Sequence, residues 1–215
     1  MPGFGDSALP AHPAIDSFLE TIEQGWGMVY PESGPLSMVG FSLGAAIAVA
    51  IGARLQDRLS NLVLAGPRLT SFAGSADLPM VSWRKIEDPA QRIAAHKRNL
   101  EVLMLANPAS IDATAVHLQS INAERMRVTI RGWKPGARDR QREYFPQLKP
   151  RGSITLIFGC EDQGAGPIIE NQGAELKAVH PDIRLHFIEG AGHWVQYEAA
   201  ERFNAIALDA LSRTA

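Results

Sequence analysis

The stretch PLSMVGFSLGAAIAVAIGARLQDR, residues 35–58, changes from a strand-like to a helix-like pattern within one residue. Its first part, 35–41, is a short and largely apolar run that predicts a buried strand. The part that follows, 43–58, consists mainly of small and apolar residues with few turn formers, and it predicts a tightly packed helix. Only a sharp turn at Ser42 can join the two elements, so this serine is the first candidate for a functional residue.

Residues GFSLG, from Gly40 to Gly44, fit the pattern G-x-S-x-G. The pattern is weakly specific by itself, because the chain has 19 glycines and chance matches occur. Its position between a predicted strand and a predicted helix makes it specific. Such a turn strains the backbone and exposes the serine hydroxyl at the carboxyl end of a sheet. We expect both glycines to be required, because side chains at these positions would clash between strand and helix.

The rest of the chain alternates strands with helices in the same way. Helices are predicted at 12–30, 43–58, 166–180 and 198–213, and strands at 35–41, 59–67, 153–159 and 183–190. This alternation predicts right-handed βαβ units and a parallel sheet of four strands, hence an α/β fold.

Residues 68–150 contain no convincing strand. Helices are predicted there at 88–107 and 108–127, with a short one near 139–146, and Asp88 and Pro89 suit the start of the first. We therefore expect two parts: a core made of 1–67 and 151–215, and a helical cap or lid inserted at 68–150.

A serine hydroxyl needs a base to act as a nucleophile at neutral pH. Among the six histidines, His193 is the candidate, because it lies in a glycine-containing loop between the last predicted strand and the last helix. The base needs an orienting acid, and Asp162 follows the third strand at the same edge of the sheet. Its neighbour Glu161 is the alternative. The remaining histidines lie in or beside helices or within a strand: His12, His96, His117, His180 and His186.

Composition narrows the classes of function. The chain has 215 residues, 46% of them hydrophobic and 20% charged, with a net charge of −2, as is usual for a globular protein. No basic stripe indicates nucleic acid or a membrane surface, and the basic stretch 131–142 is expected to be a solvated loop. The single cysteine, Cys160, excludes an internal disulfide and is expected to be a buried, inert thiol.

Targeting and cofactor signals are missing from the sequence. We find no signal peptide, no apolar run near the ~20 residues of a membrane span, no metal-ligand constellation and no phosphate loop. We therefore expect a cytoplasmic protein with no cofactor that acts on a small molecule.

The motifs together resemble the α/β-hydrolases over nearly the whole chain. They are PGFGDS, GFSLG, the helical insertion, GCED and GAGHW. The order Ser42, Asp162, His193, each just after a strand, is much more specific than any single motif. The resemblance implies that Ser42 is the nucleophile, His193 the general base and Asp162 its orienter, with the N–H of Leu43 in the oxyanion hole. The reaction implied is acyl transfer to water through an acyl-enzyme.

Within that superfamily, GHWVQYE and the segment 107–127 resemble the meta-cleavage product hydrolases, which cut carbon–carbon bonds in dienoates. Those enzymes carry a cap arginine that binds the substrate carboxylate. Its place here falls near Gln119, with Arg125 and Arg127 about two turns further on. We therefore rank hydrolysis of carboxylic esters above carbon–carbon cleavage. Phe41, Gln119 and Trp194 are expected to line the pocket, although Trp194 also suits a core position.

In the family, the PGFGDS loop follows a strand, which is preceded by further strands and by a loop that supplies a second oxyanion N–H. The resemblance starts only after that strand. We therefore expect strand 35–41 to be a sheet edge that a second copy, the N-terminal segment or a partner fragment covers. A half-built oxyanion hole would weaken hydrolysis by ~10²–10³ in kcat. A catalytically impaired binding or assembly module is the alternative from another class of function.

Overall fold

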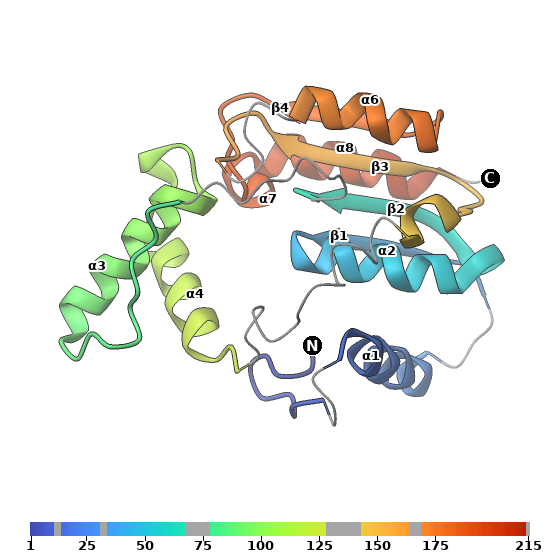
Figure 1. Ribbon diagram of the computed structural model, residues 1–215. Coiled ribbons are helices and arrows are strands. Elements are labelled where there is room, and N and C mark those ends of the chain that lie inside the picture. The colour runs from blue at the N-terminus through green and yellow to red at the C-terminus, as the bar shows by residue number, and fades with distance from the viewer. Residues whose placement is uncertain (11–13, 31–33, 68–77, 128–142, 164–168, 214–215) are drawn as a thin grey trace.

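The structure is a computed structural model that describes residues 1–10, 14–30, 34–67, 78–127, 143–163 and 169–213. Its centre is a parallel sheet of four strands, arranged in the order β1-β2-β3-β4 (Figure 1). The strands are β1 (Leu36–Phe41), β2 (Leu59–Ala65), β3 (Ile154–Gly159) and β4 (Arg184–Ile188), and all three pairings are parallel. The predicted α/β fold with a four-stranded parallel sheet is confirmed.

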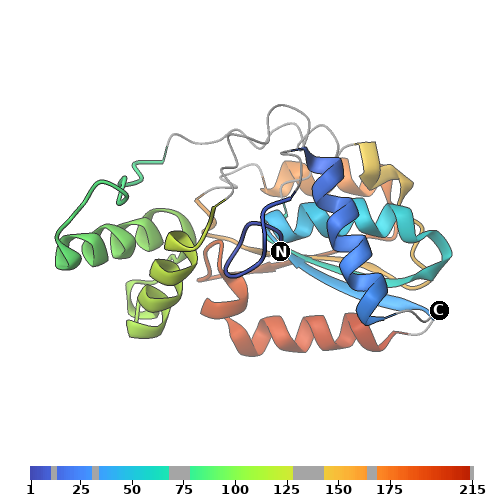
Figure 2. The ribbon, with the colours of Figure 1, turned by 90° about the horizontal axis from the view of Figure 1, so that it is seen from below.

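Helices cover both faces of this sheet (Figure 2). On one face lie α2 (Leu43–Leu55) and α6 (Ile169–Val179), and on the other lies α8 (Ala200–Ser212). Every residue of β3 is buried, because β3 is an inner strand with packed helices on each side. This burial explains why β3 reads as a continuous apolar run.

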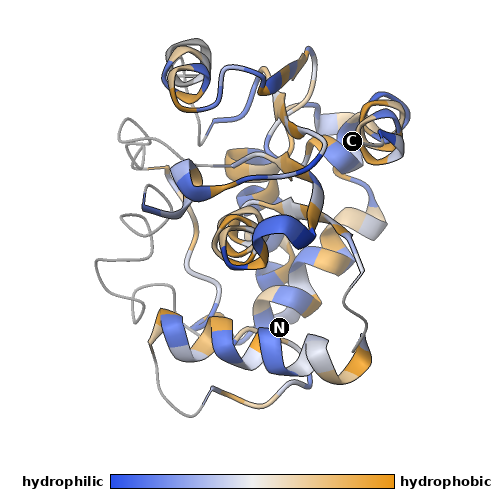
Figure 3. Ribbon diagram, turned by 90° about the vertical axis from the view of Figure 1, so that its right-hand side faces the viewer, coloured by the Kyte–Doolittle hydropathy of each residue, from blue (hydrophilic) through white to orange (hydrophobic). Residues whose placement is uncertain are grey.

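Helix α1 (Ile15–Val29) packs mainly on α2, and Met38 of β1 packs against the same apolar cluster. Its buried residues Phe18 and Leu19 contact the cluster that contains Ile47 and Ile51 of α2. Figure 3 shows hydrophilic and hydrophobic residues mixed along α1, as expected for a helix with one face on the protein and the other in water.

Strand β1 lies at the edge of the sheet. Among the strands that the structure describes, it pairs with β2 alone, as predicted. Burial alternates along it, and the side chain of Val39 is 54% exposed. This edge leaves a row of backbone groups without a strand partner within the described chain.

A helical segment lies beyond the carboxyl ends of the strands (Figure 1). We call Pro89–Glu124 the α3–α4 segment. It contains α3 (Pro89–Asn99), the π-helical turn η2 (Leu100–Met104), the 3₁₀ turn η3 (Pro108–Ser110) and α4 (Ala113–Glu124). Asp88 caps α3 by accepting the N–H of Gln91 at 2.7 Å, as its sequence predicts. The division of the chain into a core and a cap stays a prediction.

Several predicted helices were too long. The helix expected at 108–127 is broken, because Asp112 accepts the N–H of Ala115 at 2.8 Å and starts α4 anew. The helix expected at 43–58 ends at Leu55, and a 3₁₀ turn, η1 (Gln56–Arg58), follows. The helix expected at 198–213 is preceded by a separate short helix, α7 (Val195–Glu198). The short helix predicted near 139–146 is not tested over its first part, because 139–142 and the rest of the basic stretch 131–142 lie outside the described residues; residues 143–144 are helical, and the 3₁₀ turn η5 (Phe145–Gln147) follows.

Cys160 is exposed, so the prediction of a buried thiol was wrong. It is the first residue beyond β3, whose last residue is Gly159. The apolar run that suggested burial therefore ends one residue before the cysteine.

Candidate active site

Ser42 lies in the strained turn between β1 and α2. Its φ of 51° and ψ of −112° are a conformation that L-residues rarely adopt, and such strain concentrates at functional sites. Its N–H donates to the carbonyl of Ala65 on β2 at 3.0 Å, and its own carbonyl accepts the N–H of Ala45 at 3.0 Å. These bonds to sheet and helix hold the turn in place.

The two glycines of the motif differ. A Cβ at Gly40 would lie 2.6 Å from the carbonyl oxygen of Gly44 and 2.8 Å from the Cα of Ala45, so Gly40 is required by contact. A Cβ at Gly44 would have no atom within 4 Å. The prediction that a side chain at Gly44 would clash was therefore wrong, because its Cβ direction points away from the strand.

Three polar side chains meet at the carboxyl end of the sheet. The Nε2 of His193 lies 2.9 Å from the Oγ of Ser42, and its Nδ1 lies 2.6 Å from Oδ2 of Asp162. His193 and Asp162 are each 3% exposed. One tautomer satisfies both contacts: Nδ1–H donates to the carboxylate and Nε2 accepts the serine O–H.

The parallel strands bring these residues together at their shared carboxyl edge. Asp162 follows β3, and His193 follows β4, while Ser42 follows β1. Glu161 is exposed, and its N–H donates to the carbonyl of Ala191 at 3.0 Å. The structure therefore brings Asp162, and not Glu161, to His193.

Two glycines that pack against the His193 loop, Gly66 and Gly159, were not identified from the sequence. Gly66 follows β2 with φ of +51°, and a Cβ there would lie 3.0 Å from Nδ1 of His193. Gly159 ends β3, and its Cβ would lie 2.2 Å from the carbonyl oxygen of Ala191. A glycine directly at the end of each inner strand was the available signal, because a close backbone approach requires it.

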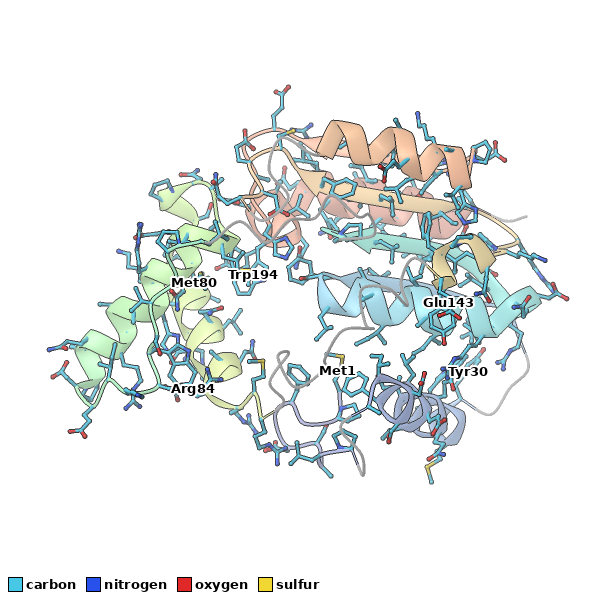
Figure 4. All side chains as sticks on the ribbon, viewed as in Figure 1. Met1, Tyr30, Met80, Arg84, Glu143 and Trp194 are labelled. Carbon is cyan, nitrogen blue, oxygen red and sulfur yellow. The ribbon has the colours of Figure 1, made fainter. Side chains whose placement is uncertain are left out.

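The residues predicted to line the pocket and the oxyanion hole differ in their contacts. The ring of Phe41 lies 5.0 Å from the ring of His193. Trp194 packs with the apolar cluster of the α3–α4 segment, and Figure 4 shows it between that segment and the sheet. Gln119 is half-buried on α4. Leu43 is the first residue of α2, where the backbone N–H has no carbonyl partner within the helix.

Arg125 and Arg127 hold the N-terminal loop. Arg125 pairs with Asp6, and its hydrogen bond lowers the pKa of that carboxyl. Arg127 donates its backbone N–H to the carbonyl of Gly3 at 2.9 Å and its guanidinium to the carbonyl of Gly5 at 3.0 Å. Phe4 and Met126 form an antiparallel bridge between the same segments. The contacts described for both arginines are thus with the loop that opens the chain.

The α3–α4 segment is tied to α7 by a polar contact. The hydroxyl of Tyr197 donates to Oδ1 of Asp112 at 2.7 Å. This bond raises the pKa of Tyr197, while the backbone N–H of Ala115, followed by Tyr197, lowers the pKa of Asp112. One carboxylate therefore caps α4 and holds it against α7.

The described residues contain no group of three or more His, Cys, Asp or Glu placed to hold a metal ion. Within the same part of the chain, no helix combines the length and the apolar character that a bilayer crossing requires.

Comparisons with known proteins point to one family. The profile described as "Alpha/beta hydrolase family" matches residues 1–206. A 2-hydroxy-6-oxo-6-phenylhexa-2,4-dienoate hydrolase of Comamonas testosteroni is 25% identical over 187 residues, which are 81% of this chain and 62% of that protein. The chain thus spans less than two thirds of the length of this relative.

Solved structures have the same fold. The meta-cleavage product hydrolase from Pseudomonas fluorescens IP01 gives a TM-score of 0.73 at 22% identity, over 98% of this chain and 77% of that one. A protein from Burkholderia cenocepacia, described in its name as a putative aryl esterase, gives a TM-score of 0.69 at 21% identity, over 99% of this chain and 79% of that one.

Proposed function

Because this chain belongs to the alpha/beta hydrolase family, we propose that it is a serine hydrolase that cleaves carboxylic esters of small substrates. One observation carries the proposal: the continuous chain of contacts from Ser42 Oγ through both ring nitrogens of His193 to the buried Asp162. This arrangement activates a hydroxyl and stabilises the imidazolium that forms when the proton moves.

The proposed reaction has two halves. Ser42 Oγ attacks the ester carbonyl carbon, and its proton passes to Nε2 of His193. The N–H of Leu43 donates to the oxyanion that develops on the carbonyl oxygen. When the intermediate collapses, His193 protonates the departing alcohol and an acyl-enzyme remains. Water then attacks the acyl carbon, His193 takes its proton and returns it to Ser42, and the carboxylic acid leaves.

The α3–α4 segment belongs to the proposed cap, residues 68–150, over the core formed by 1–67 and 151–215. It lies beyond the strand ends where Ser42 is found (Figure 1). In this proposal Phe41, Trp194 and Gln119 contribute to the substrate pocket. Trp194 is the best supported of the three, because it lies next to His193 and packs on the α3–α4 segment.

Hydrolysis of p-nitrophenyl acetate tests the proposal. We expect turnover in the unchanged protein and a fall of at least about 10³-fold in kcat for Ser42→Ala. Ser37→Ala, an exposed serine on the same strand, is the matched control and should keep full activity. A fluorophosphonate probe should label Ser42. Absence of both turnover and labelling would overturn the serine hydrolase proposal and favour a binding or assembly module.

Carbon–carbon cleavage of a dienoate is the second candidate, favoured by the name of the Comamonas testosteroni relative. The contacts of Arg125 and Arg127 with the N-terminal loop weigh against it, because those guanidinium groups are engaged there. The test compares kcat/KM for a 2-hydroxy-6-oxo-dienoate with that for the ester. A higher value for the dienoate would replace the ester proposal.

The edge of β1 supports a proposal about assembly. A strand edge with an exposed Val39 is a template for pairing, so we infer that two copies join through β1. Light scattering should then give twice the monomer mass, and Val39→Lys should reduce it to the monomer. A monomer at all concentrations would contradict pairing through this edge.

A further inference from the structure

The carboxylate of Glu198 joins two segments that are far apart in the sequence. Its Oε2 accepts the N–H of Gly192 at 2.6 Å and that of Ala106 at 3.1 Å, while Oε1 accepts the N–H of Asn107 at 2.6 Å. Gly192 precedes His193, whereas Ala106 and Asn107 belong to the α3–α4 segment. A single side chain therefore satisfies three backbone donors across this junction.

A backbone hydrogen bond fixes Trp194, the residue that follows His193. The N–H of Trp194 donates to the carbonyl of Met104 at 2.8 Å. A Cβ at Gly192 would lie 2.9 Å from the nitrogen of Ala106 and 3.0 Å from the carbonyl oxygen of Met104. The two backbones thus approach so closely that only glycine fits, and both neighbours of His193 are held on residues 104–107.

The carbonyl of Met104 is placed by a change of helix type. Helix α3 ends at Asn99, and the π-helical turn η2 continues to Met104. The N–H of Leu105 donates to the carbonyl of Leu100 at 2.9 Å, which closes this wider turn. Single π-helical turns are rare and occur often at functional sites. Here the turn delivers the segment that contacts the histidine loop.

We propose that Glu198 is a positioning residue that fixes the His193 loop on the α3–α4 segment, so that the alignment of His193 with Ser42 depends on how this segment is seated. Hydrogen bonds from N–H groups to a carboxylate are shorter and stronger than neutral ones. The loss of three such bonds frees the backbone on one side of the base. The kinetic part of this inference rests on the proposed serine hydrolase function, while the geometric part does not.

The test compares Glu198→Ala, Glu198→Gln and, as a control, Glu201→Ala, an exposed carboxylate at the start of α8. For p-nitrophenyl acetate we expect kcat to fall up to about 10²-fold in Glu198→Ala, with KM changed by less than about threefold, because the base is misplaced while the binding surface stays. In Glu198→Gln the fall in kcat should be smaller, because the amide oxygen can still accept two of the three hydrogen bonds. Glu201→Ala should have the same kcat and KM as the unchanged protein.

Proton NMR supplies a readout that does not need turnover. The Nδ1–H between His193 and Asp162 should give a far-downfield resonance in the unchanged protein and in Glu201→Ala. It should broaden or vanish in Glu198→Ala. An unchanged kcat together with an unchanged resonance in Glu198→Ala would overturn the inference. If Glu198→Ala does not fold, Glu198→Gln decides: a broadened resonance with reduced kcat supports it, and unchanged values refute it.

The two proposals fail in distinguishable ways. If the unchanged protein neither hydrolyses the ester nor reacts with the fluorophosphonate probe, the serine hydrolase function is wrong. The NMR comparison then still decides whether Glu198 positions His193.

Discussion

Two buried histidines, one at the carboxyl end of the sheet and one in the α3–α4 segment, differ in their hydrogen bonding. At the sheet, His193 and Asp162 are buried and hydrogen-bonded to each other. In the α3–α4 segment, His96 is also completely buried, yet neither ring nitrogen has a hydrogen-bond partner among the described residues. Bonded buried groups specify one arrangement, whereas unbonded ones cost stability. The hydrogen bonds of His193 therefore specify its orientation, whereas the burial of His96 without such bonds costs the α3–α4 segment stability.

Turnover should depend most strongly on the polar group formed by Ser42, His193 and Asp162. Asp162→Asn removes the acceptor that selects the tautomer of His193, so kcat for the ester should fall by about 10⁴-fold. Steady-state rates with p-nitrophenyl acetate measure this. Glu161→Gln changes the exposed neighbouring carboxylate and should leave kcat within about twofold. Equal effects of the two changes would show that Asp162 has no special role.

The second effect concerns the rigid turn itself. Gly40→Ala places a Cβ 2.6 Å from the carbonyl oxygen of Gly44, and overpacking against backbone should destabilise the protein by about 1–3 kcal/mol. Thermal melting should show a loss of about 2–4 °C per kcal/mol. Gly44→Ala is the matched control, because its Cβ meets open space within a helix and should be neutral or stabilising. Similar losses in both variants would refute the contact argument.

These two predictions also show how far the sequence could lead. The strand–turn–helix pattern at 35–58 placed Ser42, and the position of each later motif after a strand placed Asp162 and His193. Parallel strands share one carboxyl edge, so residues after different strands meet there without any knowledge of side-chain conformation. The strands of the sheet were found as short apolar runs between predicted helices, because the length of a run and its flanking residues separate a buried strand from a helix.

The sequence could not predict what depends on contacts between distant segments. The contact of Asp112 with Tyr197, which ties α4 to α7, spans 85 residues. The three bonds of Glu198 join segments about 90 residues apart. Gly40 does not tolerate a side chain and Gly44 does, because the Cα–Cβ directions at the two positions meet different surroundings. None of these features leaves a local pattern.

A smaller effect concerns the attachment of the α3–α4 segment. Tyr197→Phe removes the hydroxyl that donates to Asp112 at 2.7 Å, while the cap on α4 stays in place. Amide exchange should become faster in α4 and remain unchanged in β2 and β3, because the lost bond ties only the segment to α7. The global melting temperature should change less than in Gly40→Ala. Faster exchange throughout the sheet would show that the two regions unfold as one unit.

The smallest effect is a dependence of the stability of α3 on pH. Burial lowers the pKa of His96, with Arg92 acting in the same direction and Glu124, whose carboxylate lies 4.0 Å from Nε2, opposing them. The folded segment therefore holds His96 neutral, while the unfolded chain takes up a proton near the ordinary histidine pKa of about 6.5. The stability that the segment has with His96 neutral is fully present above about pH 6.5, and it is lost as the pH falls toward the lowered pKa of His96 in the folded state.

Amide exchange in α3, measured at about pH 7.5 and about pH 5.5 and corrected for the intrinsic rate, should show weaker protection at the lower pH. His96→Phe keeps an aromatic ring beside Trp83 and should remove this difference in α3. His186 on β4 also has a pKa lowered by burial, so His186→Gln is the control and should leave the behaviour of α3 unchanged. If His96→Phe keeps the full dependence, protonation of the unbonded histidine is not what weakens α3 at low pH, and the contrast between His96 and His193 has no measurable consequence for stability.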